Sequence, residues 1–210
     1  LLPGRAEKYG TDFAILTGDV QQAWASDVLL RSTDRGVSPE TALAMARRMQ
    51  SFLNRELISG EALDVEFEYR KVLPPKAEVI DMIRGKTGAL LAFSAECGAM
   101  AGLDTPDWTA NPVAALSEFA SELGYAFQLC DDLLGVYGDE AKFGKPLCSD
   151  FREGKPTVLY LEALERLTES GRAELAALMK RPAYAEADIA KIRSLLEECG
   201  ARAAVVRAAE

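Results

Sequence analysis

The chain has 210 residues, of which 49% are hydrophobic and 27% charged, and its formal net charge is −9. This length and composition predict one globular domain over residues 1–210 and exclude a disordered, collagen-like or disulfide-rich chain. The acidic balance argues against nucleic-acid binding, which requires clustered lysine and arginine. The absence of histidine excludes Ser-His-Asp and Cys-His relays and histidine-ligated zinc.

The cysteines and the apolar segments indicate the compartment. The four cysteines are scattered and contain no Cys-x-x-Cys pair, which is typical of reduced thiols in an intracellular protein. The longest apolar stretch, residues 87–102, contains Glu96 and is shorter than the ~20 residues that a membrane span needs. No signal peptide is visible. We therefore expect a cytoplasmic protein without a transmembrane segment.

Helical periodicity dominates the first half of the sequence. Apolar residues recur at helical spacing over residues 11–31. Ser38 and Pro39 are typical of a helix N-cap and first turn, and the helix that they begin is predicted to end at Gly60. After a short segment and two prolines, residues 76–101 predict a helix rich in small apolar residues.

The second half continues in the same way. A long helix is predicted over residues 113–137, followed by a polar loop over residues 138–156 and a helix over residues 157–170. Two or three shorter helices follow. Because no alternating strand pattern of useful length occurs, the fold class is predicted to be an all-α helical bundle around a central cavity.

The pair Asp131-Asp132 is the first chemical signal. It lies in an apolar helical turn, where two unpaired carboxylates would repel each other and lose hydration. Mg²⁺ removes both problems, because it prefers carboxylate oxygens and keeps waters and substrate phosphates as further ligands. Gln128 shares the helix face of the pair, and Asp139 does so if the helix extends that far. The alternative is a helix cap or a surface acidic pair.

Two lysine-containing segments are the second and third signals. The loop from Gly144 to Thr157 carries Lys145 and Lys155 among glycines, which suits a diphosphate held between metal and ammonium groups, although alone it would be a solvated loop. Lys86 lies in an apolar helix, where it requires an anion unless its side chain extends to solvent.

The fourth signal is the segment Gly60 to Asp64, where an acid follows a glycine that is predicted to end a helix. By itself this segment would be a helix cap. Together, however, the four signals bring carboxylates and lysines from several helices toward one cavity. The alanines at positions 89, 92, 95 and 99 would leave an apolar volume below it. This combination suggests a prenyl diphosphate substrate.

These four motifs, in this order, resemble those of the trans-isoprenyl diphosphate synthases, the family of farnesyl and geranylgeranyl diphosphate synthases. Residues 127–135 resemble the second aspartate-rich motif, and residues 144–157 resemble the downstream lysine loop. Lys86-Thr87 is similar to the Lys-Thr pair of the family, and residues 60–64 are similar to its Gly-Gln-x-x-Asp element. The resemblance extends from about residue 9 to residue 164.

The resemblance implies the isoprenoid synthase fold, a homodimer and Mg²⁺ as cofactor. It implies head-to-tail condensation of isopentenyl diphosphate with an allylic diphosphate. The implied metal-binding residues are Asp64, Asp131 and Asp132. The implied substrate-binding residues are Lys86, Thr87, Gln128, Lys145 and Lys155. Of these two groups, the implied catalytic residues are Lys86, Asp131, Asp132 and Lys145. Asp150 and Asp139 are implied to hold the metal-binding and substrate-binding groups in place without touching metal or substrate themselves.

The sequence departs from the family pattern at three places. Gly135 replaces the last aspartate of the second motif, and Glu61 stands where the family usually has glutamine. The first aspartate-rich motif and the upstream basic residues that hold isopentenyl diphosphate are absent. We expect that this part of the native chain exists but is not included, because the junction after Leu1-Leu2 resembles a splice across an omitted loop.

Three alternatives remain open. A class I terpene cyclase would ionise the same substrate, but its typical Asn-Ser/Thr-Glu metal triad is not found after Asp132. A non-catalytic synthase-like subunit would explain the missing motif, although it has little need for the charged cluster. A structural helical protein would not explain the acidic pair and the lysine loop together. The preferred product is geranylgeranyl diphosphate, since the alanines indicate room for a longer chain.

Overall fold

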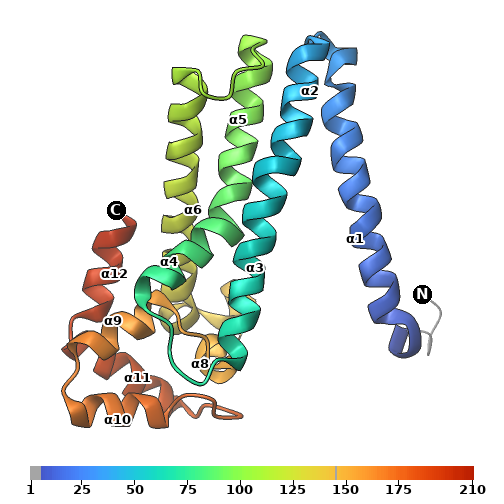
Figure 1. The fold of residues 1–210 in the computed structure, drawn as a ribbon. Helices are drawn as coiled ribbons and strands as arrows, with labels where there is room; N and C mark the ends of the chain where they lie inside the picture. The colour runs from blue at the N-terminus through green and yellow to red at the C-terminus, as the bar shows by residue number, and fades with distance from the viewer. Residues whose placement is uncertain (1–5, 145) are drawn as a thin grey trace. The chain divides into compact units, whose positions relative to one another are not determined.

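The computed structural model describes residues 6–144 and 146–210, and these residues form helices, turns and loops without any strand (Figure 1). The predicted all-α class is therefore confirmed. In the part of the chain that is described, no helix has both the length and the apolar character needed to cross a membrane. The chain divides into two compact units, one made of the residues up to Asn54 with Phe93–Leu116, the other of Arg55–Ala92 with Ser117–Glu210. The prediction of a single domain stays a prediction.

The first unit contains the N-terminal helices. Its elements are α1 (Ala6–Leu30), a 3₁₀ turn (Arg31–Arg35), α2 (Pro39–Arg48), a π-helical turn (Met49–Leu53), and parts of α5 (Ala89–Leu103) and α6 (Asn111–Tyr137). The predicted cap before α2 is confirmed, because the Ser38 hydroxyl accepts a hydrogen bond from the Thr41 N–H. Met45, Met100 and Val113 lie in the core of this unit.

Glu96 in the apolar stretch of α5 is buried and paired within the same unit. Its side chain is 2% exposed, and its two carboxylate oxygens accept hydrogen bonds of 2.8 and 2.9 Å from the Arg48 guanidinium. The guanidinium also lies over the Phe52 ring, 3.8 Å from its centroid. The bidentate ion pair explains how a charged residue is tolerated in this helix.

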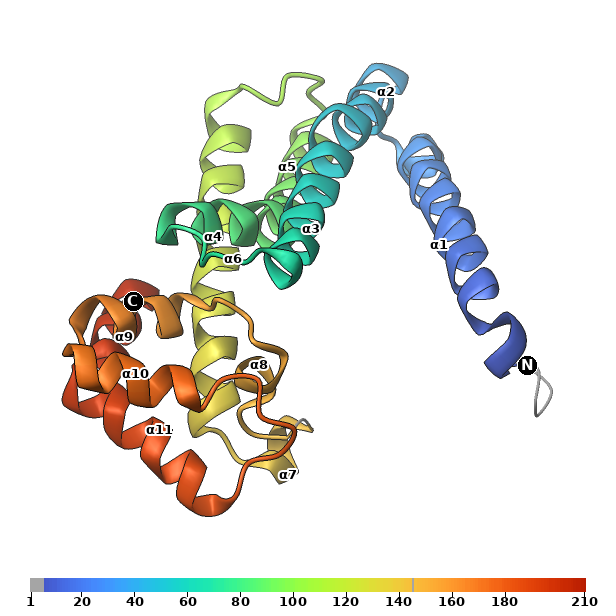
Figure 2. The same ribbon diagram turned by 60° about the horizontal axis from the view of Figure 1, so that its bottom comes forward.

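The second unit contains the C-terminal helices and the larger apolar core. It contains nearly all of α3 (Asn54–Tyr69), the beginning of α5 and most of α6. Its other elements are α4 (Lys76–Ile83), a π-helical turn (Arg84–Gly88), α7 (Glu140–Phe143), α8 (Ser149–Glu153), α9 (Val158–Arg166), α10 (Glu169–Ala177), α11 (Glu186–Glu198) and α12 (Ala201–Ala209). Figures 1 and 2 show α9 to α12 gathered beside the second half of α6. Leu129, Leu159 and Ile192 are completely buried in the core between them.

The prediction that a helix ends at Gly60 is wrong, because α3 continues through it to Tyr69. Gly60 instead allows a close approach of two backbones. A Cβ atom at this position would lie 2.8 Å from the Gly85 carbonyl carbon and 2.9 Å from the Met82 carbonyl oxygen. The glycine is therefore explained by tertiary packing of α3 rather than by helix termination.

The prediction of a continuous loop over residues 138–156 is also wrong. Two short helices, α7 and α8, form within it, and Figure 2 shows both near the end of α6. Gly144 and Gly154 end these helices at φ values of +74° and +75°, where glycine is favoured because it has no Cβ. Helices of four and five residues are too short to produce a recognisable hydrophobic period.

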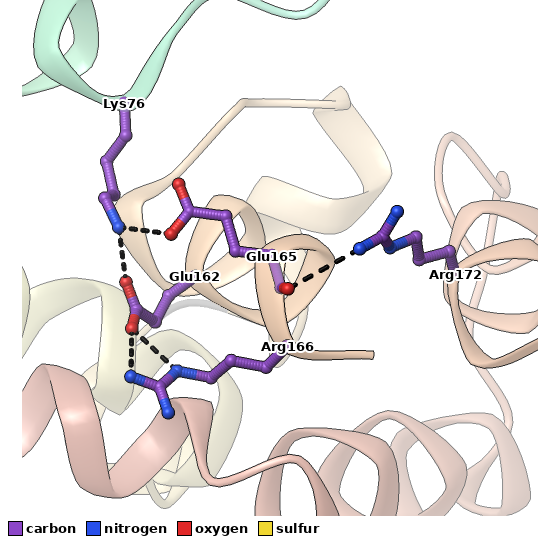
Figure 3. A network of polar contacts seen from close by, with 5 residues as sticks. All are labelled: Lys76, Glu162, Glu165, Arg166 and Arg172. Atoms are coloured by element: carbon purple, nitrogen blue, oxygen red, sulfur yellow. Dashed lines mark hydrogen bonds and ion pairs between the residues drawn. The ribbon is translucent and has the colours of Figure 1, made fainter. Parts of the chain in front are cut away.

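A polar network joins the beginning of α4 to α9 (Figure 3). The Lys76 ammonium lies 2.7 Å from a Glu162 carboxylate oxygen and 2.6 Å from one of Glu165. Arg166 also donates to Glu162. Burial opposes the charge on Glu162, but the hydrogen bonds from Lys76 and Arg166 outweigh it and lower the pKa of this carboxyl group. The network fixes α4 relative to α9.

Lys76→Met, which retains most of the aliphatic stem, is expected to lower the free energy of unfolding at pH 7 by about 1 kcal/mol. Folding lowers the pKa of Glu162 from 4.5. The stabilisation of the folded state by the ionised Glu162 carboxylate is therefore present above pH 4.5. It is lost as the pH falls through the lower folded value. Urea unfolding at pH 7 and pH 3 measures both effects.

Lys191→Met, at the exposed Lys191–Glu174 pair, is the control. An equal effect of Lys76→Met and Lys191→Met would contradict the prediction.

Candidate functional site

Close glycine contacts hold the π-helical turn Arg84–Gly88 between α3 and α6. Gly85 packs against Gly60 of α3. On the other side, a Cβ atom at Gly124 of α6 would lie 2.7 Å from the Gly88 Cα, so only glycine fits at this contact. The turn carries Lys86 and Thr87 between its two glycines, and π-helical turns are frequent at functional sites. The packing therefore brings this pair toward the acidic residues of α3 and α6.

A pocket of about 120 Å³ lies at this place in the second unit. Its polar lining comes from α3, the π-helical turn, α6, α8 and the segment before α9, and consists of Asp64, Lys86, Thr87, Gln128, Asp131, Asp132, Asp150, Lys155 and Thr157. Its apolar lining comes mainly from α4 and consists of Val79, Met82, Ile83 and Pro156. The pocket thus brings together eight of the residues that the sequence selected.

Asp132 is the most unusual group in the pocket. Its side chain is 5% exposed. One carboxylate oxygen accepts a hydrogen bond of 3.1 Å from the Gln128 amide, while the other is buried and has no hydrogen-bond partner. Burial raises the pKa of Asp132 to about 7, with smaller contributions from the nearby Asp150 and Asp131. A buried carboxylate with an unpartnered oxygen requires a proton or a cation.

The Lys86 ammonium is held by two carboxylates of α3. It lies 2.6 Å from an Asp64 oxygen and 3.0 Å from a Glu61 oxygen. Burial lowers the pKa of Lys86, but the two hydrogen bonds outweigh burial and raise it, so the group stays positively charged. The neighbouring Thr87 hydroxyl donates a long hydrogen bond of 3.4 Å to Gln128, which connects this turn to the hydrogen bond on Asp132.

Lys155 approaches the pocket from the segment between α8 and α9. Its ammonium lies 2.9 Å from a Glu153 oxygen. The hydrogen bond with Glu153 and the charges of Glu153, Asp150 and Asp64 outweigh burial and raise the pKa of Lys155. Thr157 caps α9 by accepting a hydrogen bond from the Tyr160 N–H at 3.2 Å. This cap fixes the point at which the chain leaves the pocket.

Gly135, which departs from the family motif, lies next to Asp150. A Cβ atom at Gly135 would lie 3.3 Å from the Asp150 carboxylate. The Gly135 carbonyl also accepts a hydrogen bond of 2.7 Å from the Cys148 N–H, which ties the segment before α8 to α6. The absence of a side chain at position 135 therefore leaves room for the carboxylate of Asp150 at the pocket.

One of the sequence-selected residues that the structure describes, Asp139, is not among the residues that line the pocket. Asp139 does not share the face of Asp132, because α6 ends at Tyr137. Its carboxylate accepts a hydrogen bond of 3.0 Å from the Ala141 N–H as the N-cap of α7. Lys145 lies outside the described residues.

Other features of the site were not predicted from the sequence. Thr157 lines the pocket but was not selected, although its position as a helix cap directly after Lys155-Pro156 is visible in the sequence. Glu153 was also not selected. The predicted alanines do not line this pocket, because its apolar wall comes from α4 instead. That wall could not be recognised before the packing of α4 was known.

The donor set fits a divalent cation of the magnesium type. Asp131, Asp132 and Asp64 offer carboxylate oxygens, and one oxygen of Asp132 has no other partner. Among the described residues, no group of three Asp, Glu or Cys side chains is close enough to hold a metal ion by itself. Mg²⁺ commonly takes one or two carboxylates and completes its coordination with water and substrate phosphate.

Solved structures with the same fold are prenyl diphosphate synthases. Geranylgeranyl pyrophosphate synthetase from Pyrococcus horikoshii Ot3 matches 97% of this chain and 59% of its own, with a TM-score of 0.82 and 30% identity. A geranylgeranyl pyrophosphate synthase from Corynebacterium glutamicum, complexed with isoprenyl diphosphate and magnesium, matches 99% of this chain and 57% of its own. Its TM-score is 0.78 and its identity 31%.

Sequence comparison identifies the family. The profile of the polyprenyl synthetase family matches residues 3–196, and the chain therefore belongs to this family. A geranylgeranyl diphosphate synthase of Sulfolobus acidocaldarius is 40% identical over 172 residues, which are 80% of this chain and 49% of the relative. A short chain isoprenyl diphosphate synthase of Methanocaldococcus jannaschii is 38% identical over 167 residues, which are 80% and 48% of the two chains. The chain thus spans about half the length of these relatives.

Proposed function

We propose that the protein is a Mg²⁺-dependent prenyltransferase that condenses isopentenyl diphosphate with an allylic diphosphate to a linear trans-prenyl diphosphate. The observation that carries the proposal is the buried Asp132 carboxylate, one oxygen of which has no hydrogen-bond partner, in one pocket with Lys86 and Lys155. Carboxylates for a cation and ammonium groups for phosphate oxygens are the two requirements of a metal-bound diphosphate. Geranylgeranyl diphosphate is the proposed product, supported by the names of the relatives.

The pocket residues have distinct roles in the proposed reaction. Asp131 and Asp132 would hold Mg²⁺, with Asp64 assisting from α3, and the ion when bound would neutralise charge on the departing diphosphate. Lys86 and Lys155 would bind diphosphate oxygens. Gln128 would orient the Asp132 carboxylate through its hydrogen bond, with Thr87 and Asp150 supporting these groups. Lys145 is included on the family resemblance alone.

The chemistry follows from electrostatic stabilisation of the leaving group. Departure of the diphosphate leaves an allylic cation, and the double bond of isopentenyl diphosphate attacks this cation. The proton that is then lost goes to the departing diphosphate, so that the reaction needs no histidine base. This agrees with a chain that contains no histidine.

The assembly and the location are further parts of the proposal. The family resemblance supports a homodimer. A cytoplasmic location is supported by the four cysteines, Cys97, Cys130, Cys148 and Cys199, all of which are free thiols, as expected in a reducing compartment.

The experiment is product analysis of the native protein. The protein is incubated with Mg²⁺, radiolabelled isopentenyl diphosphate and each allylic diphosphate in turn, and the products are separated by chain length. Linear elongated diphosphates ending at geranylgeranyl diphosphate are expected. Hydrocarbon formed from an allylic substrate alone would indicate a terpene cyclase, and no turnover with any pair would indicate a non-catalytic subunit.

A further inference from the structure

Both lysines that line the pocket in the described part of the chain are already paired with a glutamate outside its lining. Glu61 lies 3.0 Å from the Lys86 ammonium, and Glu153 lies 2.9 Å from that of Lys155. The two glutamate side chains are 52% and 50% exposed, so each can move into solvent. A phosphate oxygen that binds either ammonium must therefore compete with a carboxylate that is already there.

We infer that Glu61 and Glu153 act as internal counter-ions that exclude metal-free anions, so that the pocket selects a diphosphate that arrives together with a divalent cation. The inference rests on the proposed function, because it states that the same site accepts the diphosphate as its complex with a divalent cation. It assigns a role to Glu61, one of the departures from the family pattern. It also assigns a role to Glu153, which none of the four sequence signals required.

Charge in the pocket explains why the two glutamates discriminate between anions. Among the described residues, four aspartates and two lysines line the pocket. A displaced Glu61 remains one helical turn from Asp64, and a displaced Glu153 remains two positions from Lys155. Each released carboxylate would repel a metal-free diphosphate, whereas a divalent cation supplies the compensating positive charge.

The expected size of the effect is modest for each residue. Exposed ion pairs are weak. Removal of one carboxylate should therefore change the Mg²⁺ concentration needed for half-maximal binding by only about twofold to fivefold. The two glutamates pair with different lysines, on the π-helical turn and after α8. Their effects should multiply in the double variant, because the two pairs share no partner.

Equilibrium dialysis with radiolabelled inorganic pyrophosphate tests the inference. The Mg²⁺ concentration that gives half-maximal pyrophosphate binding is measured for the native protein, Glu61→Gln, Glu153→Gln and the double variant. Each single substitution is expected to lower this concentration by about twofold to fivefold. Glu174→Gln is the matched control, because Glu174 forms a similar exposed pair with Lys191, 2.6 Å away, and neither residue lines the pocket.

The possible results separate the inference from the proposed function. Shifts no larger than that of Glu174→Gln would overturn the inference. A higher Mg²⁺ requirement in Glu61→Gln or Glu153→Gln would also overturn it, because the glutamate would then help to hold the cation. If the native protein binds no pyrophosphate at any Mg²⁺ concentration, the proposed function itself fails.

Discussion

Asp132→Asn is expected to raise the free energy of unfolding at pH 8, without divalent cations, by up to about 4 kcal/mol. The reason is the burial of this carboxylate, which raises its pKa from 3.8 to about 7. At pH 8 the folded protein must hold a buried charge with an unpartnered oxygen. Asparagine fills nearly the same volume and carries no charge, so it avoids this penalty.

The pH dependence gives the sign of the effect. Between pH 3.8 and about 7, the folded protein retains a proton on Asp132 that the unfolded chain releases, and the stability of the native protein therefore falls as the pH rises through this window. The gain from Asp132→Asn should accordingly be small at pH 4 and complete at pH 8. Urea unfolding in EDTA at both values measures it.

Asp107→Asn is the control of opposite sign. Hydrogen bonds from the Thr109 hydroxyl and N–H lower the pKa of Asp107, so its charge is favourable in the folded state. Removal of that charge should not stabilise the protein at pH 8. A loss of stability in Asp132→Asn, or a gain that does not change with pH, would contradict our description of the pocket.

Gly60→Ala is expected to lower the free energy of unfolding by about 3 kcal/mol. The added Cβ atom would overlap the backbone of Gly85 and Lys86, which no rotation of a side chain can relieve. The displacement would also move Lys86, and magnesium-dependent pyrophosphate binding should weaken as well. Urea unfolding and equilibrium dialysis measure the two effects.

Gly98→Ala is the matched control. Gly98 is an exposed glycine within α5, and a Cβ atom there would meet nothing within 4 Å. This substitution should stabilise the protein by about 0.5–1 kcal/mol, since alanine is the better helix former. Equal responses at the two positions would show that α3 and the π-helical turn are not in close contact.

Local patterns predicted most of the helices and most of the pocket. Long helices such as α1 and α6 extend over many turns, so that their hydrophobic period is clear. Asp132 and Lys86 could be selected because a charged group in an apolar helix needs a partner wherever the helix lies. The sequence could not, however, show that Glu61 and Glu153 are the present partners of the lysines.

The remaining features depend on contacts between distant segments. Gly60 was interpreted as a helix end because glycine serves both termination and close packing, and only the position of Gly85 distinguishes the two. The prediction that Asp139 shares a helix face with Asp132 depended on where α6 ends, and helix ends are the least certain part of any helix prediction. The apolar wall supplied by Val79 and Met82 requires the placement of α4, which the network at Lys76 helps to fix.

The most direct test of the proposed site is magnesium-dependent pyrophosphate binding by the native protein and by the double variant Asp131→Ala/Asp132→Ala. Far-ultraviolet circular dichroism confirms that the variant is folded, which is expected because removal of a buried charge does not oppose folding. We predict that the native protein binds pyrophosphate only with Mg²⁺ and that the variant does not bind it. Unchanged binding by the folded variant would contradict the assignment of this pocket as the diphosphate site.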